Sequence, residues 1–333
     1  MEKPIDFVIA WVDGSDPAWQ AEKNRHLTGQ SGTIDAGDCR YRDWGNLKYW
    51  FRAVEQYAPW VNRVHLVTCG QVPEWLDLRA PKLHLVRHSD YIPEKYLPTF
   101  SSHPIELNLH RIEGLSEQFV YFNDDFFLTA PVRPEDFFLD GLPCDSLAEG
   151  PVQFPTEELY NSIRVNDIVF ANRHFDRAGT RARNLGKWFS PRVPRDAAKN
   201  ALMALLHKSH FFGIDLRHLP NPYLKRSFLR VWDADPELLD RTCSHKFRDS
   251  RDISQFAVRF WQLLSGDFHP YNWHRAGKAF TAGDAPAAAE SIRLKKYKML
   301  CINDSGECDF ETARQTVNCA FEAVLPQKSS FEK

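Results

Sequence analysis

The sequence predicts an α/β fold with a mostly parallel sheet, helices on both faces of that sheet, and a helical insertion. Strand and helix signals alternate up to about residue 130, in the order β-α-β-β-α-β, which favours parallel strands joined by helical crossovers. The strand signals are continuous apolar runs such as IDFVIAWV. Such runs are typical of strands that are covered on both faces.

Each element of this first part has a local signal. The run at 5–12 ends in DGSDP, a sequence typical of turns, and the apolar residues of 46–60 recur at helical spacing before Pro59. A short helix is predicted to stop at Gly114. The expected strands are 5–12, 63–70, 82–88 and the run QFVYFNDD from 118, and the expected helices are 46–60 and 105–115.

The second half lacks this alternation. Helices are predicted at 196–212 and within 235–265, a late strand at 297–304, and a frayed tail at 326–333. We therefore expect an α/β part at 1–150, a mainly helical or irregular insertion at 151–290, and a final part at 291–333 whose strand returns to the sheet.

Composition narrows the function classes. The 333 residues are 43% hydrophobic with a formal net charge of -2, so no overall basic field points to nucleic acid. The seven cysteines form no CxxC pair, which suggests neither a zinc site nor a redox pair and fits a reducing compartment. No apolar run is long enough for a signal peptide or a membrane span. We expect a soluble, cytoplasmic protein.

Three predicted strands end in acid, at WVDGSD (11–16), FNDD (122–125) and CIND (301–304). Ligands of open parallel sheets bind at the carboxyl ends of strands. Carboxylates gathered there would repel one another unless a cation lay between them, and such oxygen ligands suit Mg²⁺ or Mn²⁺. The alternative is that each Asp only caps the turn or helix that follows it.

Two basic residues could complement these acids. His218 lies in the Pro-braced RHLPNPYLKR, and Arg248 lies in SHKFRDSRDI. A histidine that titrates near neutrality can act as base or acid, and an arginine fork matches phosphate. On spacing alone, an ordinary surface position is the better explanation of both.

These residues belong to four blocks that resemble the Stealth family of sugar-1-phosphate transferases. That family includes bacterial capsular and exopolysaccharide phosphotransferases and the catalytic part of the animal N-acetylglucosamine-1-phosphotransferase. Without the extra modules and luminal targeting of the animal enzyme, the sequence resembles the bare catalytic core of the bacterial members. The blocks are FVIAWVDGSDPAW (7–19), the long segments 40–76 and 97–128, HLPNPYLK with HKFRDSRDI, and KMLCIND (298–304).

The resemblance implies a reaction and roles for residues. Family members move a hexose-1-phosphate, here expected to be an N-acetylhexosamine-1-phosphate, from a UDP-sugar to a hydroxyl of an oligo- or polysaccharide, and release UMP. The implied fold is Rossmann-like and glycosyltransferase-A-like, with the nucleotide-sugar and metal sites in 1–150. The implied site residues are His218, Arg248 and Asp304 for catalysis, Asp124 and Asp125 for Mg²⁺ (or Mn²⁺), and Asp13, Gly14, Arg111, Asn123 and Asn303 for substrate binding.

Two other functions remain open at this point. A metal-dependent glycosyltransferase would use similar acids but release UDP, and a carbohydrate-binding module could use the ten Trp as platforms. The basic run at 181–195 could hold an anionic acceptor polymer, face solvent, or touch the inner membrane surface. A peripheral contact with that membrane or with capsule assembly proteins is therefore an open expectation.

Overall fold

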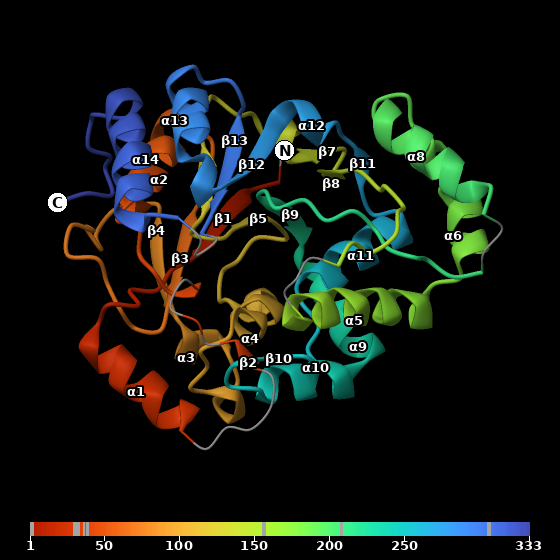
Figure 1. Cartoon of the computed structure of the whole chain (residues 1–333), viewed down its shortest axis with the longest axis horizontal. Helices are drawn as coiled ribbons and strands as arrows, with labels where there is room; N and C mark the ends of the chain where they lie inside the picture. The colour runs from red at the N-terminus through yellow and green to blue at the C-terminus, as the bar shows by residue number, and fades with distance from the viewer. Residues whose placement is uncertain are drawn as a thin grey trace.

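A five-stranded sheet forms the centre of the molecule (Figure 1). The computed structural model describes residues 3–28, 34–35, 37, 40–154, 158–206, 209–304 and 308–333. The strand order is β4-β3-β1-β5-β9, in which the first four strands are parallel and β9 runs antiparallel to β5. These strands are β1 (Ile5–Ala10), β3 (Val64–Thr68), β4 (Leu83–Arg87), β5 (Gln118–Phe122) and β9 (Asn221–Leu224).

Both faces of this sheet are covered, because its strands alternate their side chains between two apolar cores. In β1, Phe7 and Ile9 enter one core and Val8 enters the other. The first core contains α2 (Leu47–Tyr57), α13 (Ala285–Arg293) and α14 (Phe310–Val324). The second contains α3 (His88–Tyr91), α4 (Ser102–Leu107), α9 (Lys225–Ala234) and α10 (Pro236–Ser244). The predicted mostly parallel α/β fold is confirmed.

The last strand joins a second sheet, which differs from the expectation that it returns to the main one. This sheet has the order β12-β13-β6, with β13 parallel to β12 and antiparallel to β6. The chain turns back after β5, where the N–H of Phe126 donates to the carbonyl of Asn123 (3.0 Å), and the β6 that follows offers an edge to β13. The strands are β6 (Phe126–Leu128), β12 (Gly277–Thr281) and β13 (Met299–Asn303).

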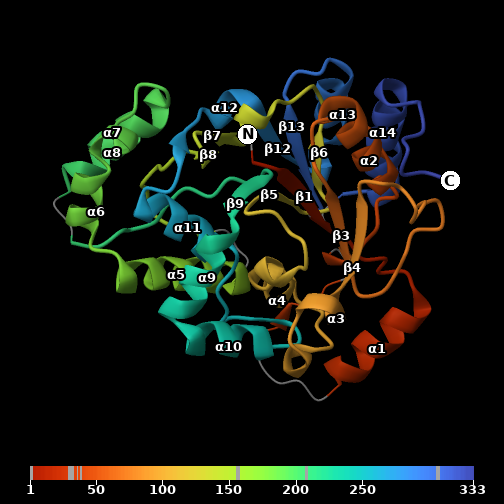
Figure 2. The ribbon, with the colours of Figure 1, turned by 180° about the vertical axis from the view of Figure 1, so that it is seen from behind.

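The helical part has a core of its own, built around Trp188, Phe211 and Phe268. Figures 1 and 2 show α6 and α8 projecting on the side of the molecule away from the C-terminus. The helix expected at 196–212 is α8, which ends at Ala204, and residues 207 and 208 lie outside the described part. Its helices are α5 (Glu158–His174), α6 (Arg177–Arg183), α7 (Leu185–Trp188), α8 (Pro194–Ala204) and α11 (Phe256–Ser265).

Shorter elements connect these layers. The helix expected at 105–115 is split into α4 and a 3-10 turn at Leu109–Arg111, and Gly114 follows at φ +71. The helical stretch expected at 235–265 is α10 and α11, separated by β10 (Arg248–Asp249). The remaining elements are α1 (Pro17–Leu27), β2 (Ile34–Asp35), β7 (Phe138–Leu139), β8 (Leu142–Asp145), β11 (His269–Pro270), α12 (Trp273–Ala276) and 3-10 turns at Glu94–Tyr96, Pro134–Asp136 and Ala282–Asp284.

The C-terminal tail is fixed, so the prediction of a frayed tail at 326–333 is wrong. The guanidinium of Arg52, on α2, donates to both carboxylate oxygens of Glu332 at 2.9 Å. Phe331 is buried and packs against Phe51. No local pattern predicts this contact, because it joins residues 280 positions apart.

No helix in the described part of the chain is long and apolar enough to cross a membrane.

Candidate active site

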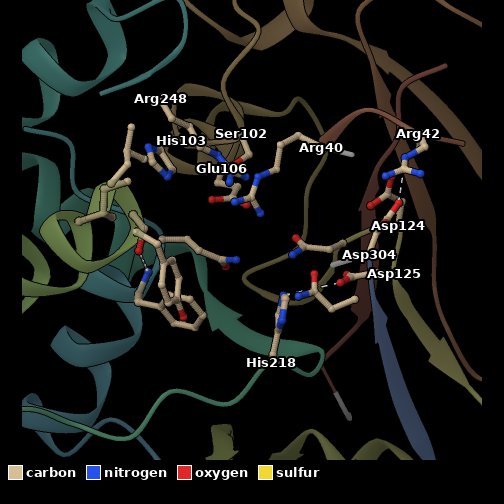
Figure 3. Close-up of a pocket in the computed structure, with 18 of the residues that line it drawn as sticks. Arg40, Arg42, Ser102, His103, Glu106, Asp124, Asp125, His218, Arg248 and Asp304 are labelled. Carbon is tan, nitrogen blue, oxygen red and sulfur yellow. Dashed lines mark hydrogen bonds and ion pairs between the residues drawn. The ribbon is translucent and has the colours of Figure 1, made fainter. Parts of the chain in front are cut away.

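A pocket of about 630 Å³ lies where β5 and β13 end (Figure 3). Figure 3 shows Asp124, Asp125 and Asp304 together with Arg42 on one side of it, and His218 below. Across from them lie Arg40, Ser102, His103, Glu106 and Arg248. The walls come from segments far apart in sequence: the 40–46 loop, α4, the β5–β6 turn, α5, the loop before β9, the β10 region and the end of β13.

The acidic side is held by a backbone contact between two strand ends. Asp124 and Asp125 lie in the turn after β5, and Asp304 follows β13. The N–H of Ile302 donates to the carbonyl of Asp125 at 2.9 Å. This bond fixes the spacing between the two chain segments, so the predicted convergence of FNDD and CIND is confirmed.

The carboxylates have different partners. Asp304 Oδ2 lies 3.2 Å from Nε of Arg42. Asp125 Oδ2 accepts from the Cys301 thiol at 3.2 Å and lies 3.7 Å from Nε2 of His218. Asp125 Oδ1 is buried and has no hydrogen-bond partner among the described residues. A buried carboxylate oxygen without a donor is expected where a ligand completes the site.

Burial, and after it repulsion from neighbouring carboxylates, determines the pKa of Asp124. Its side chain faces the open pocket, but protein atoms surround the carboxyl on the other sides. Loss of solvation from these atoms, together with the charges of Asp125 and Asp43, raises the pKa of Asp124 to about 8. The acids therefore disfavour full ionisation unless a cation offsets their charge.

The donor set fits a hard divalent cation. Asp124, Asp125 and Asp304 offer carboxylate oxygens, the ligands that Mg²⁺ and Mn²⁺ prefer. Ligand atoms of Asp125, His218 and Cys301 also lie within 4.8 Å of one another. Burial raises the pKa of the Cys301 thiol well above its usual value, so this thiol is protonated and is a poor ligand compared with the carboxylates.

The basic side is organised around Arg248. Its Nη2 donates to Ser102 Oγ at 3.0 Å. The loop that carries Arg248 is tied down by Asp252, a fully buried carboxylate that accepts from Nδ1 of His103 (3.0 Å) and from Nδ1 of His245 (2.6 Å). Two imidazoles and one carboxylate thus connect α4 to the loop and fix where the guanidinium enters the pocket.

Two further acids in the pocket wall are set to hold protons near neutral pH. Burial raises the pKa of Glu106 to about 7, although Arg248 opposes the shift, and the hydroxyl of Tyr121 donates to its Oε1 at 3.2 Å. Burial likewise raises the pKa of Asp167 to about 8, although Ser254 donates to both of its oxygens.

Seven of the predicted site residues line the pocket, and three do not. The seven are Asn123, Asp124, Asp125, His218, Arg248, Asn303 and Asp304. Asp13 instead accepts from N and Oγ of Ser15, which is the capping alternative for this residue. Arg111 donates to Asn108 and stacks on Trp232. The substrate-binding roles of Asp13, Gly14 and Arg111 stay predictions.

A smaller cavity of about 150 Å³ adjoins the pocket at the end of β1. It shares Arg40, Ser102 and Arg248 with the main pocket and is also lined by Trp11 and Val12. Asp13 and Gly14 follow directly along the chain. The N–H of Gly14 donates to the carbonyl of Tyr41 at 3.0 Å, so this turn shapes the edge of the smaller cavity.

Sequence reasoning missed several pocket residues. Arg40, Arg42 and Glu106 stand inside the quoted blocks but received no role, and the basic run RYR (40–42) was a usable signal. Asp167 lies on α5, where no motif marked the chain. Helical residues of this kind reach a site only through tertiary packing.

Two family models and several known phosphotransferases match this chain. Residues 3–28 match conserved region 1 of the Stealth proteins and residues 40–144 match conserved region 2. The receptor polysaccharide phosphotransferase WefC of Streptococcus oralis is 40% identical over 98% of this chain and 99% of its own. The capsular polysaccharide phosphotransferase WcwK of Streptococcus pneumoniae is 38% identical over 99% and 98%.

More distant proteins were also found. The exopolysaccharide phosphotransferase cps2G of Lactiplantibacillus plantarum is 37% identical over 99% of this chain and 96% of its own. Among solved structures, mouse xyloside xylosyltransferase 1 has a TM-score of 0.36 and 11% identity over 90% of this chain and 98% of that chain. A likeness of that size supports no conclusion about function.

Proposed function

This chain belongs to the Stealth family of polysaccharide phosphotransferases, and from that premise we propose that it transfers a hexose-1-phosphate from a UDP-sugar to a saccharide hydroxyl. The product is a phosphodiester in a capsular or cell-surface polysaccharide, and UMP is released. The donor carries an N-acetylhexosamine, and the acceptor is an oligo- or polysaccharide.

One observation carries the proposal: a single pocket brings the carboxylates of Asp124, Asp125 and Asp304 together with several guanidinium groups (Figure 3). Phosphoryl transfer requires little covalent chemistry from the protein, so positioning and neutralisation of charge supply most of the rate. Acids that hold a cation and arginines that contact phosphate oxygens are the groups this task needs. A site for neutral sugars alone would not need them.

Asp124, Asp125 and Asp304 would hold Mg²⁺ or Mn²⁺, which neutralises phosphate charge when bound. Arg248, fixed by Ser102 and Asp252, binds the oxygens of the phosphate that is transferred. The attacking hydroxyl oxygen bonds to the phosphorus next to the sugar, and the bond from that phosphorus to the bridging oxygen breaks. UMP leaves with that oxygen.

His218 accepts the proton of the attacking hydroxyl. Its ring packs edge-on against Phe126, and its Nε2 lies 3.7 Å from Asp125 Oδ2. The side chain is 41% exposed, so an acceptor can reach it from solvent. A neutral imidazole beside an acidic cluster can take a proton as the hydroxyl attacks.

The reaction takes place in the cytoplasm, at the inner face of the plasma membrane. The six cysteines of the described part, all but Cys39 of the chain, are free thiols. Free thiols support a reducing compartment.

Nucleotide analysis tests the proposal directly. Incubation with Mg²⁺, a saccharide acceptor and a panel of UDP-hexoses should yield UMP, and phosphorus NMR of the product should show a phosphodiester. Release of UDP instead of UMP would establish a glycosyltransferase and overturn the proposal.

A matched pair of variants locates the activity in the pocket. Asp124→Asn should lower kcat by about two to three powers of ten, as removal of one well-placed charged group does. Asp140→Asn, whose side chain is 80% exposed outside the pocket, should behave as wild type. Equal activity of the two variants would remove Asp124 from the site.

A further inference from the structure

The helix α8 is attached to the protein by polar side chains, whereas its leucines face solvent. On the attached face, Asn200 donates to the carbonyls of Leu147 and Trp188. Asp196, on the same face, pairs with His274 at 3.0 Å. Leu202 and Leu205 are 65% and 70% exposed. A helix that only packs on its own protein has the reverse pattern, with apolar residues inward.

The outward face is continuous along the helix. Arg195, Ala198 and Leu202 of α8 and its C-cap residue, Leu205, are all exposed and recur at helical spacing, so they lie on one side of the helix. Asp196, Asn200 and Met203 are buried and share the opposite side. The exposed stripe therefore has a cation at its start and two leucines at its end.

Exposed cations lie near this stripe. The α6–α8 arm (residues 177–206) contains seven Lys or Arg and a single acid, Asp196; Arg177 is buried against Glu149 and Lys199 pairs with Asp215. Arg183, Arg192 and Arg195 are exposed. Figures 1 and 2 show that the arm projects from the body of the protein, so its surface can approach a flat partner without obstruction from the sheet domain.

We propose that the α6–α8 arm docks on an anionic lipid bilayer, with Leu202 and Leu205 inserted at the headgroup boundary and the exposed arginines on the headgroups. Leucines on one helix face with surrounding cations are the combination by which interfacial helices bind anionic membranes. A polysaccharide would favour cations or aromatic platforms and gain nothing from exposed leucines. A membrane contact therefore explains both features of the arm.

The docking rests on the proposed location at the inner face of the plasma membrane. If the docking fails, the proposed transfer reaction is unaffected. The consequence of docking is that the enzyme works beside acceptors that are anchored in the membrane. Transfer to a soluble acceptor does not require it.

Vesicle sedimentation of the full chain tests the docking. The protein should sediment with vesicles of phosphatidylcholine and phosphatidylglycerol and stay in solution with phosphatidylcholine alone. Leu202→Glu with Leu205→Glu should weaken binding about tenfold or more. Arg192→Glu with Arg195→Glu should also weaken it and reduce its salt dependence.

A matched control uses Leu294, which is 66% exposed at the end of α13, on another side of the molecule. Leu294→Glu should bind vesicles as wild type does. All variants should release UMP normally with a soluble acceptor, which separates loss of docking from loss of function. Absence of binding to anionic vesicles, or equal binding by the Leu202 and Leu294 variants, would overturn the proposal. Concentration-dependent dimerisation that is lost only in the Leu202→Glu, Leu205→Glu protein would also overturn it, in favour of a second copy.

Discussion

Asp124 should hold a proton whenever no cation is bound, and this makes the affinity for a divalent ion depend on pH. Burial and the charges of Asp125 and Asp43 raise its pKa to about 8. At pH 7 only about one tenth of the metal-free protein would have this carboxyl ionised. A metal ion binds the carboxylate form and must displace that proton.

The size of the pH effect on metal affinity follows from the pKa of Asp124, about 8. Between pH 6 and pH 7 the ionised fraction of Asp124 rises about tenfold, and the apparent affinity for Mg²⁺ should rise by the same factor. Above about pH 8 the affinity should level off. An aspartate with its usual pKa is fully ionised throughout this range and would give a flat profile.

Isothermal titration calorimetry with Mn²⁺, in buffers of different ionisation enthalpy, measures both the affinity for the ion and the number of protons released on binding. About 0.9 proton should be released for each ion bound at pH 7, and Asp124→Asn should abolish most of that release. Glu106→Gln is the control, because Glu106 also has a raised pKa but lies across the pocket from the acid cluster (Figure 3). An affinity that stays constant from pH 6 to pH 8, or binding without proton release, would refute the reasoning.

The raised pKa of Asp124 also makes the stability of the folded protein depend on pH. The raised pKa means that the folded metal-free protein binds a proton at Asp124 more tightly than the unfolded chain does. Its contribution to stability is therefore lost as the pH rises from about 4 to about 8. Thermal unfolding should show a larger rise in Tm on addition of Mg²⁺ at pH 8 than at pH 6. An equal rise at both values would contradict this account.

Three other substitutions have expected outcomes. Asp252→Asn removes the buried charge that accepts from two imidazoles and should lower kcat by about tenfold to a hundredfold with little change in KM, measured by UMP release. Glu332→Ala leaves the buried guanidinium of Arg52 without its bidentate partner and should cost about 3 kcal/mol in urea denaturation. Gly14→Ala places a Cβ 2.1 Å from the carbonyl oxygen of Tyr41, so the turn must shift and the Tm should fall.

Each of these has a control and a contrary result. Arg79→Ala removes an exposed ion pair and should leave the urea midpoint unchanged. If it lowers the stability as much as Glu332→Ala does, the contact of the tail with Arg52 contributes no more than an exposed ion pair. Gly283→Ala meets only an ordinary contact at 3.6 Å and should keep the wild-type Tm. A change in KM alone in Asp252→Asn would place Asp252 in binding instead of in positioning Arg248.

The sequence predicted the parts of the fold that local patterns determine. Continuous apolar runs identify β1, β3 and β5, and the rule for parallel strand ends predicts that Asp124 and Asp304 lie together. The route was different from the expected one. Asp304 follows β13, which belongs to the second sheet. The chain turns back after β5 to form β6, and β6 provides the edge on which β13 pairs; no local sequence pattern predicts this.

Residues that depend on distant contacts were not predictable in this way. Asp167 faces the pocket only because α5 packs there, and Glu332 is fixed only by Arg52. Arg111 shows the opposite case: it stands in a family block, but a local partner, Asn108, and the ring of Trp232 hold its side chain away from the pocket. Membership of a block therefore does not decide whether a side chain reaches the site.

The hydrogen bond from Ile302 to the carbonyl of Asp125 has a consequence for the substitutions that this side of the pocket tolerates. It couples the two acidic segments through main-chain atoms, so any residue other than proline at position 302 can make it. Part of the opposite wall is supplied by α5, whose Ile168 and Ala171 belong to the core of the helical part. The arrangement of the carboxylates and the residues of that layer can therefore change independently of each other.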